Sequence, residues 1–433
     1  MENGTNGHGL SKRGWSNVDS IMPRIRAQVA ERQAKQTTNI DLSTAENWLI
    51  RDELVELCKD AIVTNLEARH MSYPRGFSGD PQLLEAYAAF FNQYFNPRIP
   101  VEPSHISTAA GAHWCIDSLL YNICDSGDGV MIPGPYWNGF DFGFKARAEV
   151  IPVLVELPDL ESSFIWSLLS ALEETYNNAQ CHIRALMLTN PHNPLGQCYP
   201  KDLLEGCLRF CQRHAIHFIS DEVYALTNFK TTDEIETTPF TSVLSLDLAA
   251  LGVDMSRVHT VWSLSKDLGQ SGFRMGCIIT QANQEMVVGA SLAANTQISA
   301  LSTIFATSLL TSSKLPELIK SNSKKLGQAY GTLTTFLRSH GIRYIPCYAG
   351  LYVFAHLTDL MKSPVDLTET EMVQRLKEVG VIVSAGRAYH CPSGVAGWAR
   401  IGFALPPQEL HEAITRMDSV FRSIRKSTVT QSQ

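Results

Sequence analysis

Segments typical of strands alternate with segments typical of helices through the middle of this 433-residue chain. Helical spacing of apolar residues predicts helices over residues 80–91 and 203–214. Short apolar stretches, each closed by a turn or a polar cluster, predict strands over residues 129–132, 149–155, 183–188, 216–220 and 258–262. This alternation indicates an α/β sheet with crossover helices, and ligands of such sheets bind at the carboxyl ends of the strands.

The C-terminal part of the chain has a different order of segments. Residues 315–340 predict one long helix or a helical pair. Strands are expected over residues 351–355, 381–383 and 398–403, followed by a last helix over 408–424.

Composition excludes several classes of protein. The chain is 44% hydrophobic and 18% charged, with a formal net charge of −7, so it is globular and lacks the basic footprint of a nucleic-acid binder. No apolar run reaches the ~18–20 residues of a membrane span. Residues 1–15 are polar and glycine-rich, which predicts a disordered tail and no secretory signal. The ten cysteines are scattered, as expected for reduced thiols in a cytoplasmic protein.

One group of residues deserves comparison with a metal site. Cys211, His214 and His217 lie close together in the sequence, but they end a predicted helix and lead into a strand. No fourth ligand is evident beside them, so we expect no zinc site there and no metal elsewhere.

The segment Ser263–Gly276 (SLSKDLGQSGFRMG) follows a predicted strand and combines a lysine with hydroxyls, glycines and an arginine. A phosphate group needs short hydroxyl donors, exposed backbone N–H groups and a guanidinium fork, which Ser263, Ser265 and Arg274 can help to supply. A lysine beside a phosphate site, here Lys266, suggests a Schiff base with pyridoxal 5′-phosphate (PLP). The alternative is an ordinary surface lysine in a Ser/Gly-rich loop.

Other segments contain the remaining groups that PLP requires. Asp221 ends a predicted strand and can keep the pyridine nitrogen protonated, although it can also be a simple helix cap. Tyr224 and Asn193 can both reach the phenolic oxygen of the cofactor. The Asn193 segment, NPHNPLG, can equally be only a proline-stiffened loop.

Two further turns complete the predicted cofactor site. Ala112 and His113 lie in a small-residue turn before a helix expected to begin near Trp114, and a helix N-terminus binds anions through its N–H groups. We assign both residues to the phosphate, mainly through their backbones. Trp137 follows a strand and can stack on the cofactor ring, or it can be a core aromatic.

These motifs together resemble the fold-type-I PLP enzymes of the class I/II aminotransferase group. They occur in the family's order over roughly residues 38–424, and they are SLSKDLGQSGFRMG, SDEVY, NPHNPLG, AGAH and PYWNGFD. The closest resemblance is to 1-aminocyclopropane-1-carboxylate (ACC) synthase and its fungal ACC-synthase-like relatives. It is supported by the box Ala45–Asn47 (AEN) and the stretch Gly397–Ile401 (GWARI).

The resemblance implies an architecture and an assembly. It implies a large domain with a mixed, mostly parallel seven-stranded sheet and a smaller α/β domain built from both chain ends. The expected boundaries place residues 16–55 and 316–433 in the small domain and 56–315 in the large PLP-binding domain. Such enzymes act on small amino-acid substrates as homodimers with two active sites at the subunit interface.

The resemblance also implies roles for individual residues. Lys266 would bond to the cofactor and then transfer the Cα proton of the substrate, with Asp221 and Tyr224 as its catalytic partners. Arg400 would bind the substrate α-carboxylate; the alternative for it is a surface salt bridge. Glu46 would lie near the substrate side chain. Tyr73 would reach the phosphate of the neighbouring subunit.

The chain departs from the plant ACC synthases at three positions near the substrate. Trp48 stands where those enzymes have Gln, Trp137 where they have Tyr, and Arg387 where they have a small polar residue. We therefore expect Trp48 and Arg387 to reshape the side-chain pocket beside an intact PLP site.

Three hypotheses for the function follow. The leading one is a PLP-dependent, ACC-synthase-like lyase that removes the Cα proton of an α-amino acid, followed by elimination, replacement or cyclisation, in fungal secondary metabolism. The second is an aminotransferase that passes an amino group to a 2-oxo acid, because the fold does not choose between these outcomes. The third, a catalytically inactive binding protein, predicts loss of Lys266, Asp221 or Arg400, and all three are present.

Overall fold

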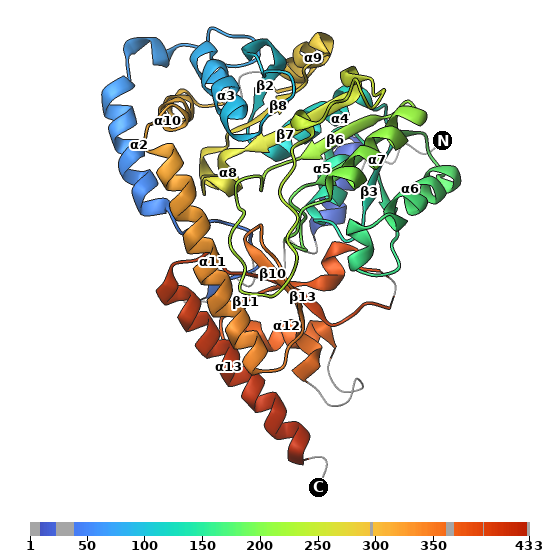
Figure 1. The fold of residues 1–433 in the computed structure, drawn as a ribbon, viewed down its shortest axis with the longest axis vertical. Coiled ribbons are helices and arrows are strands. Elements are labelled where there is room, and N and C mark those ends of the chain that lie inside the picture. Colours follow the sequence, from blue (N-terminus) through green and yellow to red (C-terminus); the bar gives the residue numbers. More distant parts are fainter. Residues whose placement is uncertain (1–8, 23–38, 295–297, 361–367, 393, 431–433) are drawn as a thin grey trace.

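The structure is a computed structural model that describes residues 9–22, 39–294, 298–360, 368–392 and 394–430 (Figure 1). Seven strands form the central sheet in the order β2-β8-β7-β6-β5-β3-β4. Strand β8 runs antiparallel to both neighbours and the other pairs are parallel, which confirms the predicted mixed, mostly parallel sheet. The strands are β2 (Ile106–Ala109), β3 (Gly129–Pro133), β4 (Ile151–Val155), β5 (Ile183–Thr189), β6 (His217–Asp221), β7 (Val258–Ser263) and β8 (Gly276–Ile279).

Helices cover both faces of this sheet, so most strand residues are buried. Leu186 and Phe218 pack in the core beneath α6 and α7, whereas their chain neighbours Ala185 and Ile219 pack on the opposite face with α4, α5 and α9. This alternation follows from the two-residue period of a strand. The helices of this part are α2 (Arg51–Asn65), α3 (Pro81–Tyr94), α4 (Ala112–Ile123), α5 (Gly139–Ala146), α6 (Ser167–Asn178), α7 (Lys201–Arg213), α8 (Leu264–Asp267), α9 (Gln284–Ala294) and α10 (Ala300–Leu310).

A smaller unit follows the central sheet in the chain and lies below it in Figure 1. Its antiparallel sheet has the order β12-β13-β10-β9, and the two-residue strand β1 from the N-terminal part pairs in parallel with β11. The small unit therefore contains residues from both ends of the chain, as expected. Its elements are β1 (Ile40–Asp41), α11 (Leu315–Ser339), β9 (Tyr344–Ile345), β10 (Tyr352–His356), α12 (Glu369–Glu378), β11 (Val381–Ile382), β12 (Ser384–Ala385), β13 (Trp398–Gly402) and α13 (Pro407–Thr430).

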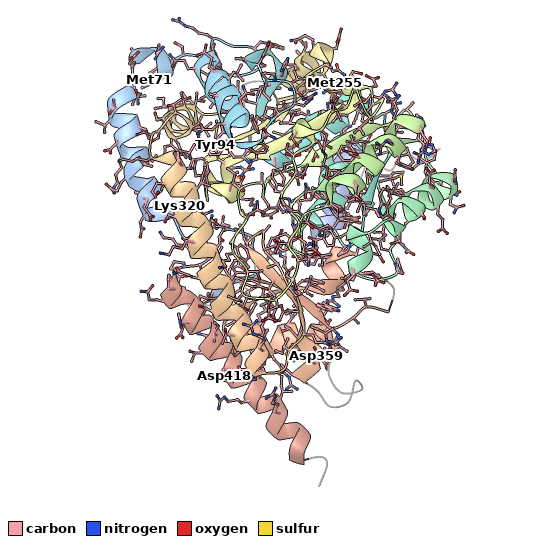
Figure 2. All side chains as sticks on the ribbon, viewed as in Figure 1. Met71, Tyr94, Met255, Lys320, Asp359 and Asp418 are labelled. Carbon is pink, nitrogen blue, oxygen red and sulfur yellow. The ribbon has the colours of Figure 1, made fainter. Side chains whose placement is uncertain are left out.

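Side chains fill the region between the two units in Figure 2, where the ribbons alone leave space.

Short 3-10 helices connect the main elements. They are η1 (Ala68–Met71), η2 (Pro103–His105), η3 (Glu161–Phe164), η4 (Val243–Ser245), η5 (Met255–Arg257), η6 (Ser271–Phe273), η7 (Leu357–Leu360) and η8 (Gly386–Tyr389).

The structure departs from the sequence predictions near the N-terminus. Residues 12–22 are helical, so the disordered tail expected over residues 1–15 is wrong for residues 12–15. Tertiary contacts hold this helix: Asn17 Nδ2 donates to the Ala146 carbonyl oxygen at 2.8 Å, and Arg13 lies 4.0 Å from the Glu149 carboxylate. The expected domain boundaries remain predictions, although Ile50 and Leu54 pack in the core of the large unit.

Candidate active site

Lys266 lies directly after the carboxyl end of the buried strand β7. The N-cap of α8 holds this turn, because Ser263 Oγ accepts a hydrogen bond from the Ser265 N–H at 3.0 Å. The Lys266 ammonium donates to the Ala45 carbonyl oxygen at 2.6 Å. Burial, together with the positive charge of Arg400, lowers the pKa of Lys266 to about 8. The amine is therefore partly neutral near physiological pH, as a nucleophile or a proton acceptor must be.

Asp221 lies at the carboxyl end of β6. Its Oδ2 accepts a hydrogen bond from Thr189 Oγ1 at 3.4 Å, whereas the buried Oδ1 has no partner among the described residues. Burial raises the pKa of Asp221 to about 7. A buried carboxylate oxygen without a donor fits a protonated ring nitrogen, which would stabilise the charged form.

Asn193 and Tyr224 are both buried at the same edge of the sheet. Asn193 Oδ1 accepts a hydrogen bond from Arg400 Nη1 at 2.9 Å, which leaves the NH₂ group to donate elsewhere. The Tyr224 ring lies edge-on to Tyr352, with ring centroids 5.6 Å apart, and burial raises the pKa of Tyr224. Each side chain therefore carries a donor, and their assignment to the phenolic oxygen remains a prediction.

An anion cradle lies where α4 begins. Helix α4 starts at Ala112, two residues earlier than expected, because Gly111 turns the backbone at a φ of +89°. The Arg274 guanidinium closes over this turn: Nη2 donates to the Ala110 carbonyl oxygen at 2.8 Å, and a Cβ at Gly111 would come within 2.7 Å of the same nitrogen.

The first N–H groups of α4 complete this cradle. No side chain caps the helix N-terminus, and in the described part of the chain the N–H groups of Ala112 and His113 have no acceptor. Burial and the charge of Arg274 lower the pKa of His113, against the opposing effect of Asp117. A neutral His113, an arginine fork and free N–H groups at a helix N-terminus fit a phosphate group.

Arg400 occupies the small-unit side of the site, on β13. Only 4% of it is exposed, and Nη2 donates to the Ser43 carbonyl oxygen at 2.5 Å. The guanidinium carbon lies 4.8 Å from the ring centre of Tyr352 and 5.1 Å from that of Tyr389. Its Nε has no hydrogen-bond partner among the residues described. A buried guanidinium with an unused N–H fits a bound carboxylate, and the surface salt bridge weighed for Arg400 is excluded by its burial.

The electrostatic environment of Lys266 shows that the predicted groups converge. The charges of Arg400 and Arg274 lower the pKa of Lys266, and those of Glu46 and Asp221 raise it, although these residues come from distant parts of the sequence.

The wall expected to face the substrate side chain is partly assembled. Glu46 Oε2 lies 3.0 Å from Arg51 Nη2, and the Arg51 guanidinium lies 3.4 Å over the Trp48 ring. Trp137 is 36% exposed and lies edge-on to Phe140.

Two predicted residues are not brought to this site within the described chain. Arg387 is exposed, and its backbone N–H donates to Glu369 Oε1 at 2.9 Å. Tyr73 is 85% exposed beside an open cavity of about 840 Å³ formed by residues 69–80 with α9 and α10. Their roles remain predictions.

The structure adds residues that sequence reasoning missed. Asn47 Nδ2 donates to Asn322 Oδ1 at 2.9 Å, and Asn322 Nδ2 donates to the Asp267 carbonyl oxygen at 3.2 Å. A Cβ at Gly269 would come within 2.5 Å of the Asn47 carbonyl oxygen. The AEN box therefore packs directly against the segment that carries Lys266, and the box itself was the signal for Asn47.

The two histidines near Cys211 have other partners. His214 Nε2 lies 2.8 Å from Glu173 Oε2, and His217 Nδ1 lies 2.9 Å from His259 Nε2. In the part of the chain that the structure describes, no group of three metal-ligating side chains occurs. The described helices also include none that is both long and apolar enough to span a membrane.

Comparisons with known proteins show which family this chain is similar to. The family model for class I and II aminotransferases matches residues 39–417. The probable aminotransferase aclI of Aspergillus oryzae is 50% identical over 414 residues, which cover 96% of this chain and 98% of the relative. The trimodular acetylaranotin synthesis protein ataIMG of Aspergillus terreus is 38% identical over 88% of this chain and 39% of its own length.

A plant relative and a solved structure extend the comparison. 1-Aminocyclopropane-1-carboxylate synthase 1 of Oryza sativa subsp. indica is 32% identical over 88% of this chain and 80% of its own length. A mutant of Thermus thermophilus aspartate aminotransferase superposes with a TM-score of 0.76 at 21% identity, covering 95% of this chain and 99% of that one. This likeness shows the fold.

Proposed function

The chain belongs to the class I and II aminotransferase family, and we propose that it is a PLP-dependent lyase. Its substrate would be an α-amino acid whose side chain carries a sulfur leaving group, or a leaving group of similar chemistry. The observation that carries this proposal is the contact of the AEN box with Lys266. The Ala45 carbonyl oxygen lies 2.6 Å from the amine, and the charge of Glu46 raises the pKa of Lys266.

This contact favours a lyase because it brings the segment that carries Glu46, a second titratable group, next to the base. Lys266 would serve the Cα position, while Glu46, held by Arg51 at 3.0 Å, would face the substrate side chain. A carboxylate there can exchange a proton with a departing group. The 32% identity to the rice ACC synthase also supports the proposal.

The residues of this chain would divide the work as follows. Arg274, Ala112 and His113 hold the phosphate, and Asp221 keeps the ring nitrogen protonated. When bound, PLP supplies an electron sink that stabilises negative charge at the substrate Cα. Arg400 binds the α-carboxylate, and Lys266, whose lowered pKa suits it to accept a proton, takes the proton from Cα.

The overall reaction balances without another reactant except water. An S-substituted cysteine and water would yield a thiol, a 2-oxo acid and ammonium. The C–S bond breaks, and hydrolysis of the C–N bond releases the ammonium.

An aminotransferase is the second candidate, and the names of the fungal relatives favour it. Cofactor spectra distinguish the two reactions. With S-substituted cysteines and other amino acids added to the PLP-loaded protein, the lyase predicts release of 2-oxo acid and ammonium while the cofactor stays PLP. Stoichiometric conversion to pyridoxamine phosphate would contradict the lyase. Lys266→Ala is the inactive control for either reaction.

The proposal extends to assembly and setting. The protein would act as a homodimer in which Tyr73 reaches the phosphate of the neighbouring subunit, since Tyr73 is 85% exposed in the single chain. The name of the ataIMG relative supports a role in fungal secondary metabolism. Sedimentation of the PLP-loaded protein tests the dimer: a monomer at micromolar concentration would contradict it.

A further inference from the structure

The segment Gly386–His390, which includes η8 of the small unit, docks on the turn between β3 and α5 of the large unit. The Tyr136 N–H donates to the Tyr389 carbonyl oxygen at 2.7 Å. A Cβ at Gly134 would come within 2.7 Å of the His390 carbonyl oxygen, so the two backbones touch. This contact joins two parts of the chain that are far apart in the sequence: His390 and Asp141 are separated by 249 residues.

Three side chains close this contact. Tyr136 Oη donates to Asp141 Oδ1 at 2.7 Å, and His390 Nε2 lies 2.7 Å from Asp141 Oδ2. The rings of Tyr136 and His390 stack, with centroids 4.4 Å apart and planes 24° apart. Each side chain therefore contacts both of the others.

The backbone of His390 indicates that this arrangement is specified. His390 has a φ of +54°, in the left-handed region that non-glycine residues seldom adopt. A residue persists there only when surrounding contacts hold it, and such positions cluster at functional sites. Here the contacts are those with Asp141 and Tyr136.

The charges around Asp141 keep it ionised. Burial alone would raise its pKa, but hydrogen bonds from His390 and Tyr136, with the charges of His390 and Lys145, lower it overall. About one third of each of the His390 and Asp141 side chains is exposed, so water screens part of this attraction.

The cluster formed by Tyr136, Asp141 and His390 is connected to both sides of the candidate site. Trp137 follows Tyr136 directly and is the residue assigned to the cofactor ring. Tyr389 precedes His390, and its ring centre lies 5.1 Å from the Arg400 guanidinium. The cluster thus joins the wall that carries Trp137 to the strand that carries Arg400.

We infer that Asp141 and His390 are positioning residues that clamp the segment Gly386–His390 onto the Trp137 wall and so fix the distance between the cofactor ring and the carboxylate-binding arginine. They act through Trp137, Tyr389 and Arg400. This inference rests on the proposed function for the meaning of Trp137 and Arg400, but the clamp itself can be tested without catalysis.

The test compares His390→Leu, which removes the hydrogen bond, with His390→Gln, which keeps an N–H donor for Asp141. His411→Gln, an exposed histidine on α13, is the control. PLP affinity is measured by absorbance titration, and kcat and KM are measured separately. In His390→Leu we expect PLP binding to weaken and KM to rise about tenfold, as expected for one lost charge-assisted hydrogen bond, while kcat changes less than threefold. His390→Gln should restore both within threefold.

Hydrogen exchange on the same proteins separates the clamp from the proposed function. Amides of residues 386–390 and 134–141 should exchange at least tenfold faster in His390→Leu than in the parent protein or the control. Unchanged exchange, or a Gln variant indistinguishable from Leu in PLP affinity and KM, would overturn the clamp. A parent protein that binds no PLP would contradict the proposed function, while the exchange result would still decide on the clamp.

Discussion

Replacing Arg400 by lysine keeps the charge but removes the planar fork. In the structure the guanidinium donates to Asn193 Oδ1 at 2.9 Å and to Ser43 O at 2.5 Å, and its buried Nε is unused. A lysine ammonium is a single point of charge. It cannot bind Asn193 and Ser43 and also hold a carboxylate through two parallel hydrogen bonds. The loss of one hydrogen bond to a charged group costs about 1.5–3 kcal/mol, and about 1.4 kcal/mol is tenfold, so kcat/KM should fall about 10- to 150-fold.

Initial rates of amino-acid consumption by Arg400→Lys, over a range of substrate concentrations, measure this effect. Most of the loss should appear as a higher KM, because the carboxylate is bound before and during the reaction. The PLP absorbance should be unchanged, which shows that the cofactor site is intact. Arg209→Lys, on the exposed face of α7, is the matched control and should stay within twofold. A change of less than threefold in Arg400→Lys would refute the assignment of this residue to the carboxylate.

Three further predictions concern the lysine, its carboxylate partner and the AEN box. In the cofactor-free protein, modification of Lys266 by an amine-selective reagent should rise with pH through about 8, because burial favours the neutral amine; a midpoint near the ordinary value of 10.5 would contradict this. Asp221→Ala should weaken PLP binding at least tenfold in an absorbance titration, since the ring nitrogen loses its buried acceptor, and unchanged affinity would remove Asp221 from the site. Asn47→Leu should lower the free energy of unfolding by about 2–4 kcal/mol in urea, because Asn47 loses its hydrogen bonds to the Lys266 carbonyl oxygen, Asn322 Oδ1 and the Leu49 N–H, and buried Asn322 Oδ1 loses its donor; the exposed Asn178→Leu is the control, and equal losses in both variants would count against the network.

The central sheet could be predicted because its signals are local. Residues 216–220 were expected as a strand and form β6, His217–Asp221, which delivers Asp221 to the site. Polar residues that follow apolar strands lie at one edge of a parallel sheet, so strand prediction also placed several candidate groups together.

The errors and omissions arise from contacts between distant segments. The polarity of residues 12–15 suggested a tail, but the helix there is held by groups near residues 146–149. Helix α4 begins early because of the turn at Gly111, whose backbone conformation the composition does not reveal. Asn322 and Tyr352 reach the site from α11 and β10, and nothing in their local sequence marks them as site residues.

The account depends most on a covalent bond between Lys266 and the cofactor. Borohydride reduction of the PLP-loaded protein, followed by peptide mapping with mass spectrometry, tests that bond directly. The predicted result is one phosphopyridoxyl group per chain, on the peptide that contains Lys266, and none in Lys266→Ala. Label on a different lysine, or no label at all, would contradict the assignment.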